Sequence, residues 1–384
     1  MRDVVIIEAV RSPIGKREGK LSGTLPVYLA ARILQELMSR AHVEPALVQD
    51  VIFGCVTPVG EQGANIARLS VLQAGFPVAV PAVTINRMCG SSQQAIHFAA
   101  QEILSGDMDV VIAGGIEVMS RVPIGSDWPG QWPSDFPYPL VHQGISAEMM
   151  ADKWNLTRED LDRYSFDSHV KAAAATRRGD FAREIVPIPV TWPDGASGTM
   201  TSETMTIDEG IRFEPNLEKM SKLQPAFKPD GVITAANSSQ ISDGAAAVLL
   251  MSANKAKELG LRPRARIVAR VVVGSDPVLM LSGPIPATRL ALDRAGLTLD
   301  RIDAIEINEA FASVVLAWQK EIQPDPVRVN PNGGAVALGH PLGATGAILM
   351  TKLLHHLERT DGRYGLQTMC IGHGMATATI IERL

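Results

Sequence analysis

The chain of 384 residues lacks the features that define several classes of protein. Its three cysteines, Cys55, Cys89 and Cys370, are too few for a disulfide framework and too widely spaced for a structural zinc site. No block of Lys or Arg stands out at a net charge of −5, so nothing indicates nucleic acid or an anionic membrane as a partner. No apolar run reaches transmembrane length, and charge interrupts the N-terminal segment, unlike a signal peptide. We therefore expect a globular protein in a reducing, cytoplasmic setting, with no metal site and no membrane span.

Strand-like and helix-like patterns alternate at the start of the chain and again near its end. This alternation predicts an α/β protein whose helices cover a mixed or parallel sheet. The region of about 119–234 differs, because tryptophans and prolines crowd its first part and two helical patterns follow. The longer helix is expected at Arg158–Arg178, with Thr157 as N-cap and Asp160 at its third position. We interpret this region as an excursion from the α/β body, such as a lid or a substrate-facing subdomain.

The two α/β segments repeat the same order of elements, which predicts a duplicated domain. The corresponding segments are 50–54 with 303–307, 83–86 with 327–330, and 110–115 with 367–372. We expect short strands in these segments, including one at Val327–Val329. If the two halves face each other, the Gly-rich turns that open their helices converge on one site.

Cys89 lies between a β-branched segment and an Ala-rich helical pattern, in a Gly/Ser-rich turn. A thiol at the start of a helix meets the positive end of the peptide dipoles, which favours the thiolate. Taken alone, a cysteine is more often a small buried hydrophobic residue. Cys89 is therefore a candidate nucleophile that needs partners elsewhere in the chain.

The second half contains residues that suit this partnership. His340 lies in a glycine-dense turn before a helix, where it is a candidate general base, and the alternative is a hydrogen-bonded turn histidine. Cys370 precedes a glycine turn and is a candidate proton donor distinct from the nucleophile. A core cysteine on a strand is the simpler interpretation of this residue alone. Asn308 follows a buried strand, where it is a candidate oxyanion donor, and the alternative is a helix-capping asparagine. Cys55 has no such surroundings, and we assign it to the core.

The chain resembles the thiolase family, the acyl-CoA C-acyltransferases, along its whole length. The motifs that carry this resemblance occur in the family's order: the turn around Cys89, Asn308-Glu309-Ala310-Phe311, Gly339-His340-Pro341, and Cys370-Ile371-Gly372. The resemblance implies two similar βαβαβαββ halves in a five-layer α-β-α-β-α body with an inserted loop domain. The implied division is residues 1–118 with 235–262 for the first half, 119–234 for the loop domain, and 263–384 for the second half.

The resemblance also implies roles for the residues of these motifs. Cys89 would carry the acyl group as a thioester, His340 would activate Cys89, and Cys370 would act as acid and base. One oxyanion hole would use His340 with a water held by Asn308. The other would use the backbone N–H groups of Cys89 and Gly372.

Coenzyme A is implied as a co-substrate, with no tightly bound cofactor. Arg212 matches the family position near the adenine and its phosphates, and Ser239 matches a position that contacts the pantetheine arm. Considered alone, Arg212 is a solvated surface charge and Ser239 a turn serine. The resemblance suggests a homodimer or homotetramer, with acyl-CoA and CoA as the small-molecule partners.

Three positions depart from the family pattern. The late cysteine is followed by Gly372-His373-Gly374, where the family often has three glycines. Gly90-Ser91-Ser92 replaces a more glycine-rich turn after Cys89. Gln143, after His142, replaces a methionine that packs near small acyl groups in biosynthetic acetoacetyl-CoA thiolases. This last change favours a degradative enzyme for longer or bulkier acyl chains, as in fatty-acid or sterol side-chain breakdown.

Other functions remain as alternatives. A biosynthetic acetoacetyl-CoA thiolase would use the same residues in the condensing direction. A ketoacyl-synthase-like condensing enzyme would pair a cysteine with two histidines, or with His and Asn, and would not need Cys370. A non-catalytic acyl-CoA-binding relative would lack the thiol or the histidine, and a cysteine hydrolase would have no use for two thiols.

Overall fold

The structure is a computed structural model that describes residues 3–193 and 200–384. Strands and helices alternate in both terminal parts, as the sequence predicts. The elements of the first part are β1 (Val4–Arg11), β2 (Gly15–Lys16), α1 (Pro26–Ala41), β3 (Asp50–Gly54), α2 (Ile66–Gln73), β4 (Val83–Ile85), α3 (Ser91–Ser105) and β5 (Val110–Val118). After an insertion they continue with β8 (Ser242–Ser252) and α7 (Ala253–Glu258). The second part comprises β9 (Ala265–Gly274), α8 (Pro284–Ala295), β10 (Ala304–Ile307), α9 (Ala312–Ile322), α10 (Ala335–Leu338), α11 (Thr345–Thr360), β11 (Tyr364–Ile371) and β12 (Met375–Arg383).

Apart from the edge strand β4, the two halves have the same strand order, which confirms the expected duplication. The first runs β4-β3-β5-β8-β1, with β3 parallel to β4 and β5, and β8 antiparallel to β5 and β1. The second runs β10-β11-β12-β9, with β10 parallel to β11, and β12 antiparallel to β11 and β9. The halves join where β1 and β9 pair over two residues each, Val5 with Arg266 and Ile6 with Ala265.

The prediction of a short strand at Val327–Val329 is wrong. Pro326–Arg328 forms a 3-10 turn, in which the Asp325 carboxylate accepts a hydrogen bond from the N–H of Val327 at 3.0 Å. An Asp-Pro pair favours such a turn because Pro fixes φ and cannot donate to a strand. Only Val329 retains sheet character, through a single parallel bridge to Ile305 of β10 at the place that β4 occupies in the first half.

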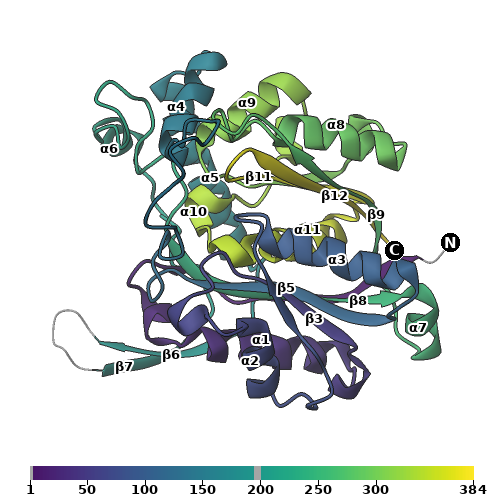
Figure 1. Ribbon diagram of the computed structural model, residues 1–384. Coiled ribbons are helices and arrows are strands. Elements are labelled where there is room, and N and C mark those ends of the chain that lie inside the picture. The colour runs from purple at the N-terminus through teal and green to yellow at the C-terminus, as the bar shows by residue number, and fades with distance from the viewer. Residues whose placement is uncertain (1–2, 194–199) are drawn as a thin grey trace.

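The elements stack in five layers (Figure 1). Helices α1 and α2 cover the outer face of the first sheet, α3 and α11 lie between the two sheets, and α8 and α9 cover the outer face of the second. Small residues permit the central contact: a Cβ on Gly346 of α11 would lie 2.3 Å from the backbone N of Gln93 on α3. This layering places the N-terminal ends of α3 and α11 close together.

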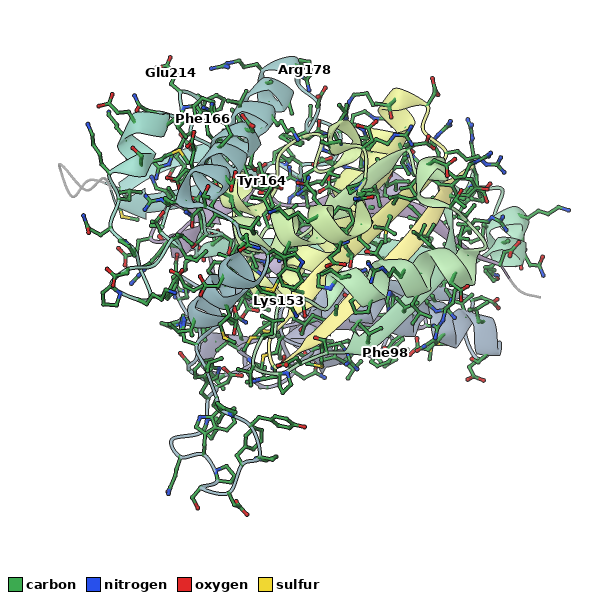
Figure 2. All side chains as sticks on the ribbon, turned by 90° about the horizontal axis from the view of Figure 1, so that it is seen from above. Phe98, Lys153, Tyr164, Phe166, Arg178 and Glu214 are labelled. Carbon is green, nitrogen blue, oxygen red and sulfur yellow. The ribbon has the colours of Figure 1, made fainter. Side chains whose placement is uncertain are left out.

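The insertion between β5 and β8 contains α4 (Gln143–Lys153), α5 (Arg158–Arg178), the hairpin of β6 (Ile188–Pro193) and β7 (Met200–Met205), and α6 (Leu217–Ser221). Helix α5 begins with the expected capping box, since the Thr157 hydroxyl accepts from the N–H of Asp160 and the Asp160 carboxylate accepts from the N–H of Thr157. Figure 2 shows α5, marked by Tyr164, Phe166 and Arg178, at one side of the body, away from Phe98 of α3.

Besides the two-residue β2, two strand regions are absent from the sequence-based predictions. Strand β8 is buried along its whole length between β5 and β1, yet its Gly- and Ala-rich start has low strand propensity. Its burial on both faces removes the alternation that identifies a half-exposed strand. The β6–β7 hairpin is the second omission, and its polar β7 carries little apolar pattern.

Candidate active site

Cys89 lies in a tight turn between β4 and α3. The Asn86 side chain holds this turn, because its Oδ1 accepts from the N–H of Met88 at 2.8 Å and its Nδ2 donates to the Val56 carbonyl at 2.9 Å. Met88 has a left-handed φ of 45°, and Gly90 is the N-cap of α3. A Cβ at Gly90 would lie 2.4 Å from Ile371 Cδ1, so glycine lets the turn approach the second sheet.

The Cys89 thiol is buried, and its surroundings act on its charge in opposite directions. Burial raises the pKa of the thiol to about 11, while the N–H groups of Gly372 and Cys89 and the side-chain amide of Gln143 act to lower it. The Glu117 carboxylate nearby adds to the increase. The site therefore provides donors for a thiolate but holds a neutral thiol at rest.

Cys370 brings a second sulfur to the same place from the second half. It is the penultimate residue of β11 and is buried. Burial raises its pKa well above the ordinary range, and charge on Cys89 raises it further, which shows that the two thiols are neighbours. The turn after β11 carries Gly372, whose N–H faces the Cys89 sulfur. Both predicted thiols and the predicted backbone donor thus lie together.

His340 and Asn308 form a hydrogen-bonded pair beside this cluster. The Asn308 Nδ2 lies 3.3 Å from His340 Nε2, and His340 Nδ1 lies 2.6 Å from the Thr345 hydroxyl oxygen. Since the Thr345 hydroxyl donates to the Pro341 carbonyl at 2.8 Å, it accepts from Nδ1–H, and Nε2 keeps its lone pair. Burial lowers the pKa of His340 to about 4, so the ring is neutral. Leu342, which follows in the same turn, packs in one small apolar cluster with Cys89.

The segment that returns from the insertion ties these motifs together. The Gln240 carbonyl and the Ser242 hydroxyl both accept from the N–H of His340 at 3.2 Å. Ser239 donates its N–H to the Ala310 carbonyl at 2.9 Å, which places this predicted CoA contact beside the Asn308 motif. Gln240 also donates through its side chain to the Gly210 carbonyl at 3.0 Å.

Arg212 follows Gly210 and is exposed. Its N–H donates to His169 Nδ1 at 3.2 Å, and burial, together with the Arg212 charge, lowers the pKa of His169 to about 4. The loop that carries Arg212 is anchored by Asp208, whose two carboxylate oxygens accept from the buried Arg11 guanidinium at 2.7 and 2.9 Å. The chain four and two residues before Arg212 is thus tied to Arg11 and to Gln240.

Two residues that contact the site were not predicted for these roles. The sequence singled out Gln143 only because it replaces a methionine of the family pattern, yet its amide acts on the Cys89 sulfur. Thr345 sets the tautomer of His340, and no pattern marked it. A residue at the first position of a helix after a glycine-rich turn is the nearest sequence signal for Thr345.

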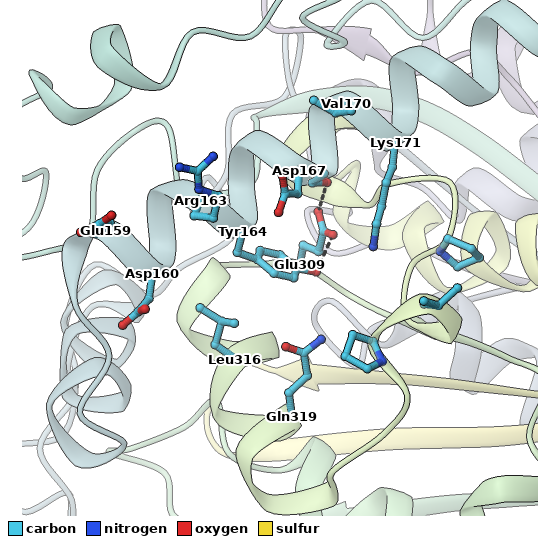
Figure 3. A pocket seen from close by; sticks show the side chains of 14 residues that line it. Glu159, Asp160, Arg163, Tyr164, Asp167, Val170, Lys171, Glu309, Leu316 and Gln319 are labelled. Carbon is cyan, nitrogen blue, oxygen red and sulfur yellow. Dashed lines mark hydrogen bonds between the residues drawn. The ribbon is translucent and has the colours of Figure 1, made fainter.

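A cavity of about 830 Å³ lies outside this cluster, between α5 and α9 (Figure 3). None of the predicted site residues lines it. Its inner wall includes Glu309, whose carboxylate accepts from the Tyr164 hydroxyl at 2.7 Å and the Ser168 hydroxyl at 2.8 Å, drawn as dashed lines in Figure 3. The same carboxylate accepts from the N–H of Val336 at 3.1 Å, so Glu309 fixes the loop after Asn308 to α10.

Within residues 3–193 and 200–384, no group of three or more His, Cys, Asp or Glu side chains is arranged to hold a metal ion. Over the same residues, no helix has the length and apolarity needed to cross a bilayer.

Comparison with known proteins covers the whole chain. Residues 4–254 match the family model "Thiolase, N-terminal domain", and residues 261–383 match "Thiolase, C-terminal domain". The chain is 52% identical to the steroid 3-ketoacyl-CoA thiolase FadA6 of Mycobacterium tuberculosis, over 100% of this chain and 95% of that protein. It is 44% identical to the 3-ketoacyl-CoA thiolase of Klebsiella pneumoniae over 100% of both chains. The crystal structure of the Bacillus anthracis acetyl-CoA acetyltransferase superposes with a TM-score of 0.92 at 40% identity, covering 100% of this chain and 99% of that one.

Proposed function

The chain belongs to the thiolase family, and we propose that it cleaves 3-ketoacyl-CoA with CoA into acetyl-CoA and an acyl-CoA shortened by two carbons. The observation that carries this proposal is that two neighbouring buried thiols lie beside the turn that carries a neutral histidine, itself paired with an asparagine. Cleavage of a C2–C3 bond requires a nucleophile at C3 and a separate acid for the departing enolate. The Cys89 turn supplies the nucleophile and the Cys370 strand supplies the acid. The His340 and Asn308 segments supply the base and an oxyanion donor.

In the first half-reaction, Cys89 attacks the 3-keto carbon and its proton passes to Nε2 of His340. The C2–C3 bond then breaks, its electron pair forms the enolate of acetyl-CoA, and Cys370 protonates C2. The N–H groups of Cys89 and Gly372 hold the oxygen at C3, and an oxyanion donor of this kind contributes about 3 kcal/mol. His340, with a water held by Asn308, holds the enolate oxygen.

In the second half-reaction, the Cys370 thiolate takes the proton of incoming CoA. The CoA thiolate attacks the acyl-Cys89 thioester, and Cys89 leaves and regains its proton from His340. The two steps exchange one thioester for another, so the kinetics are ping-pong and the reverse condensation uses the same groups. The neutral His340 supports this assignment, because a lone pair on Nε2 is needed to accept the proton.

CoA binds as a co-substrate at the rim formed by the insertion. Arg212 is exposed there and suits the phosphates of the nucleotide end, and Ser239 lies beside the Asn308 motif, where the pantetheine arm approaches the thiols. The insertion of residues 119–234 thus acts as the CoA-facing domain within the first half, 1–118 with 235–262, and residues 263–384 form the second half. The protein acts as a homodimer or homotetramer in the cytoplasm.

The substrates are 3-ketoacyl-CoA molecules with acyl groups larger than acetoacetyl. Gln143 in place of a small-acyl methionine supports this choice, as do the relatives named 3-ketoacyl-CoA thiolase and steroid 3-ketoacyl-CoA thiolase. A panel of 3-ketoacyl-CoA substrates of varied length and branching, assayed with free CoA, tests it. A preference for acetoacetyl-CoA would favour the biosynthetic alternative.

Two variants test the mechanism. Cys89→Ala should abolish CoA-dependent thiolysis while acyl-CoA binding survives, and undiminished turnover would overturn the proposal. Cys370→Ala should block both half-reactions yet leave Cys89 open to alkylation. An unaffected rate in Cys370→Ala would favour a ketoacyl-synthase-like arrangement, and binding without any thiolysis in the unmodified protein would favour a non-catalytic relative.

A further inference from the structure

A buried carboxylate beside the catalytic cluster has no task in the proposed reaction. Glu117 lies one residue before the end of β5 and is buried. Its Oε2 accepts from the N–H of Val56 at 2.8 Å and from the N–H of Gly343 at 2.9 Å. Its Oε1 accepts from the N–H of Thr57 at 3.2 Å and from the side-chain amide of Gln62 at 2.8 Å. Glu117 thus joins the loop after β3 to the turn before α11.

The contact with Val56 leads to the nucleophile. The Val56 carbonyl accepts from Asn86 Nδ2 at 2.9 Å, and Asn86 Oδ1 accepts from the N–H of Met88 at 2.8 Å, directly before Cys89. Val56 and Cys89 also pack in the same small apolar cluster. Only the backbone of Val56 therefore separates Glu117 from the side chain that shapes the Cys89 turn.

The contact with Gly343 leads to the base. Gly343 follows His340 by three residues, in the turn that joins this histidine to α11. A Cβ on Gly343 would lie 2.8 Å from Glu117 Oε2 and 2.8 Å from the Cα of Cys55, so glycine lets the turn approach the carboxylate. The segments of nucleophile and base thus meet at one carboxylate oxygen.

Donors fill both oxygens of Glu117, so this carboxylate cannot also bind substrate. Besides the four nitrogen donors, the Cys55 thiol lies 3.8 Å from Oε1. Gln62 is itself fixed, because its Nε2 also donates to the Thr57 carbonyl at 2.9 Å and its Oε1 accepts from the N–H of Val118 at 2.7 Å. Burial raises the pKa of Glu117, and its hydrogen bonds act to lower it. A carboxylate held in one orientation in this way suits positioning rather than catalysis.

We propose that Glu117 is a positioning residue that holds the Cys89 turn and the His340 turn in the alignment needed for proton transfer between them. Because Oε2 accepts from both segments, movement of one turn relative to the other stretches one of its two hydrogen bonds. A misplacement of about 1 Å can cost about 100-fold in rate, even when its cause lies away from the reacting atoms. This inference rests on the proposed thiolase function, in which Cys89 passes its proton to His340, and deepens it.

Two substitutions separate the position of the carboxylate from its charge, and the first changes the position. Glu117→Asp keeps the charge but withdraws the oxygens by about 1.5 Å, the length of one C–C bond. The rate constant for acylation of Cys89 in a single turnover with a 3-ketoacyl-CoA should fall about 10- to 100-fold. The substrate concentration that gives half the maximal rate should not change, because Glu117 does not touch substrate. An unchanged acylation constant would overturn the inference.

Glu117→Gln keeps the length of the side chain and removes the charge. Its amide oxygen can still accept from Val56 and Gly343, at the expense of Thr57 and Gln62, so the acylation constant should stay within about threefold of the unmodified value. A fall in Glu117→Gln equal to that in Glu117→Asp, or larger, would show that the charge acts rather than the alignment, and would overturn the inference.

Loss of folding is measured apart from loss of alignment. The single-turnover constant belongs to the folded molecules, since unfolded chains lower only the amplitude. Glu148→Asp is the matched control, because Glu148 is a buried carboxylate of α4 that accepts from the N–H groups of Val232 at 2.9 Å and Ile233 at 3.0 Å, within the insertion. Glu148→Asp should keep the acylation constant, and a fall equal to that in Glu117→Asp would overturn the inference.

Alkylation of Cys89 by iodoacetamide tests the nucleophile without the base. In Glu117→Asp its rate should stay within about twofold, because the charge near the thiol is kept. An alkylation rate that falls as far as the acylation constant would place the damage in the Cys89 turn alone and overturn the inference. If Glu117→Asp gives no folded protein, Gln62→Met removes one orienting donor instead and should lower the acylation constant about threefold, and an unchanged constant would count equally against the inference. Absence of thiolysis with every substrate in the unmodified protein would overturn the proposed function instead.

Discussion

Gln143 contacts the Cys89 sulfur through a side-chain amide, and its removal should change the reactivity of this thiol. Gln143→Met is the most informative change, because methionine has a similar size and the same unbranched shape but no donor. Gln143 is the first residue of α4, and the N-cap His142 accepts from the N–H of Gly144 rather than from the Gln143 side chain. The helix start should therefore survive the substitution.

The size of the effect follows from the contacts of the sulfur. A hydrogen bond to a charged group contributes about 1.5–3 kcal/mol, and 1.36 kcal/mol corresponds to one pH unit of pKa. The N–H groups of Gly372 and Cys89 remain in the variant and compensate in part. We therefore expect the Cys89 pKa, about 11 in the unmodified protein, to rise by about one pH unit. Below that pKa the thiolate fraction, and with it the alkylation rate, should fall about tenfold.

The assay is the rate of iodoacetamide alkylation between pH 7.5 and 9.5, with Cys89 identified by mass spectrometry so that Cys55 and Cys370 do not contribute. Gln101→Met makes the same chemical change at an exposed position of α3 and should leave the rate unaltered. An unchanged Cys89 rate in Gln143→Met, or an equal fall in Gln101→Met, would refute the argument that this amide stabilises the thiolate.

Three further predictions concern buried polar groups. Thr345→Val leaves the Nδ1–H of His340 without its acceptor, so kcat for thiolysis should fall about 10- to 100-fold, and Thr345→Ser should restore most of it. Burial lowers the pKa of His97 from 6.5 to about 3, so the unfolded chain binds the extra proton as the pH falls, and this site alone should remove about 2 kcal/mol of stability between pH 6.5 and 5. Urea unfolding of His97→Gln should show a correspondingly weaker acid dependence, and an identical slope would contradict the assignment. Glu117→Gln replaces an acceptor of three backbone N–H groups and one side-chain amide by a group with one oxygen, so the free energy of unfolding should fall by about 2–4 kcal/mol in chemical denaturation.

Much of the scaffold follows from local pattern. The capping box of Thr157 and Asp160 predicts the start of α5, because the two side chains satisfy each other's backbone donors without help from the rest of the fold. Two of the three strand correspondences also follow, because 50–54 with 303–307 and 110–115 with 367–372 are buried apolar runs. The third fails because Pro326–Arg328 forms a 3-10 turn. Strand β8 could not be predicted from the sequence. A central strand of small residues shows neither apolar–polar alternation nor high strand propensity.

Part of the active site could also be predicted from local sequence pattern. Cys89 and His340 stand next to glycines in turns, and Cys370 lies near the end of β11, two residues before Gly372. A reactive side chain in or near a glycine-rich turn can be recognised in the sequence. Gln143 was visible only as a substitution, since its contact with the sulfur depends on how the insertion folds back over the turn after β11. Thr345 had no signal, because its hydroxyl meets His340 through a 3-10 turn that joins the glycine-rich segment to α11.

The charge state of the resting pair constrains the proposed mechanism. With the Cys89 pKa at about 11 and that of His340 at about 4, moving the proton from sulfur to nitrogen costs about 10 kcal/mol before the two charges interact. Opposite charges about 4 Å apart recover about 4 kcal/mol of this at an effective dielectric constant of 20. The ion pair is therefore a minor species in the free enzyme, and the pair rests as thiol and imidazole. Proton transfer then accompanies attack on the 3-keto carbon, when the negative charge passes from sulfur to an oxygen that the N–H groups of Cys89 and Gly372 can hold. A thiolate band near 240 nm in the free enzyme at pH 7, lost in Cys89→Ala, would contradict this order of events.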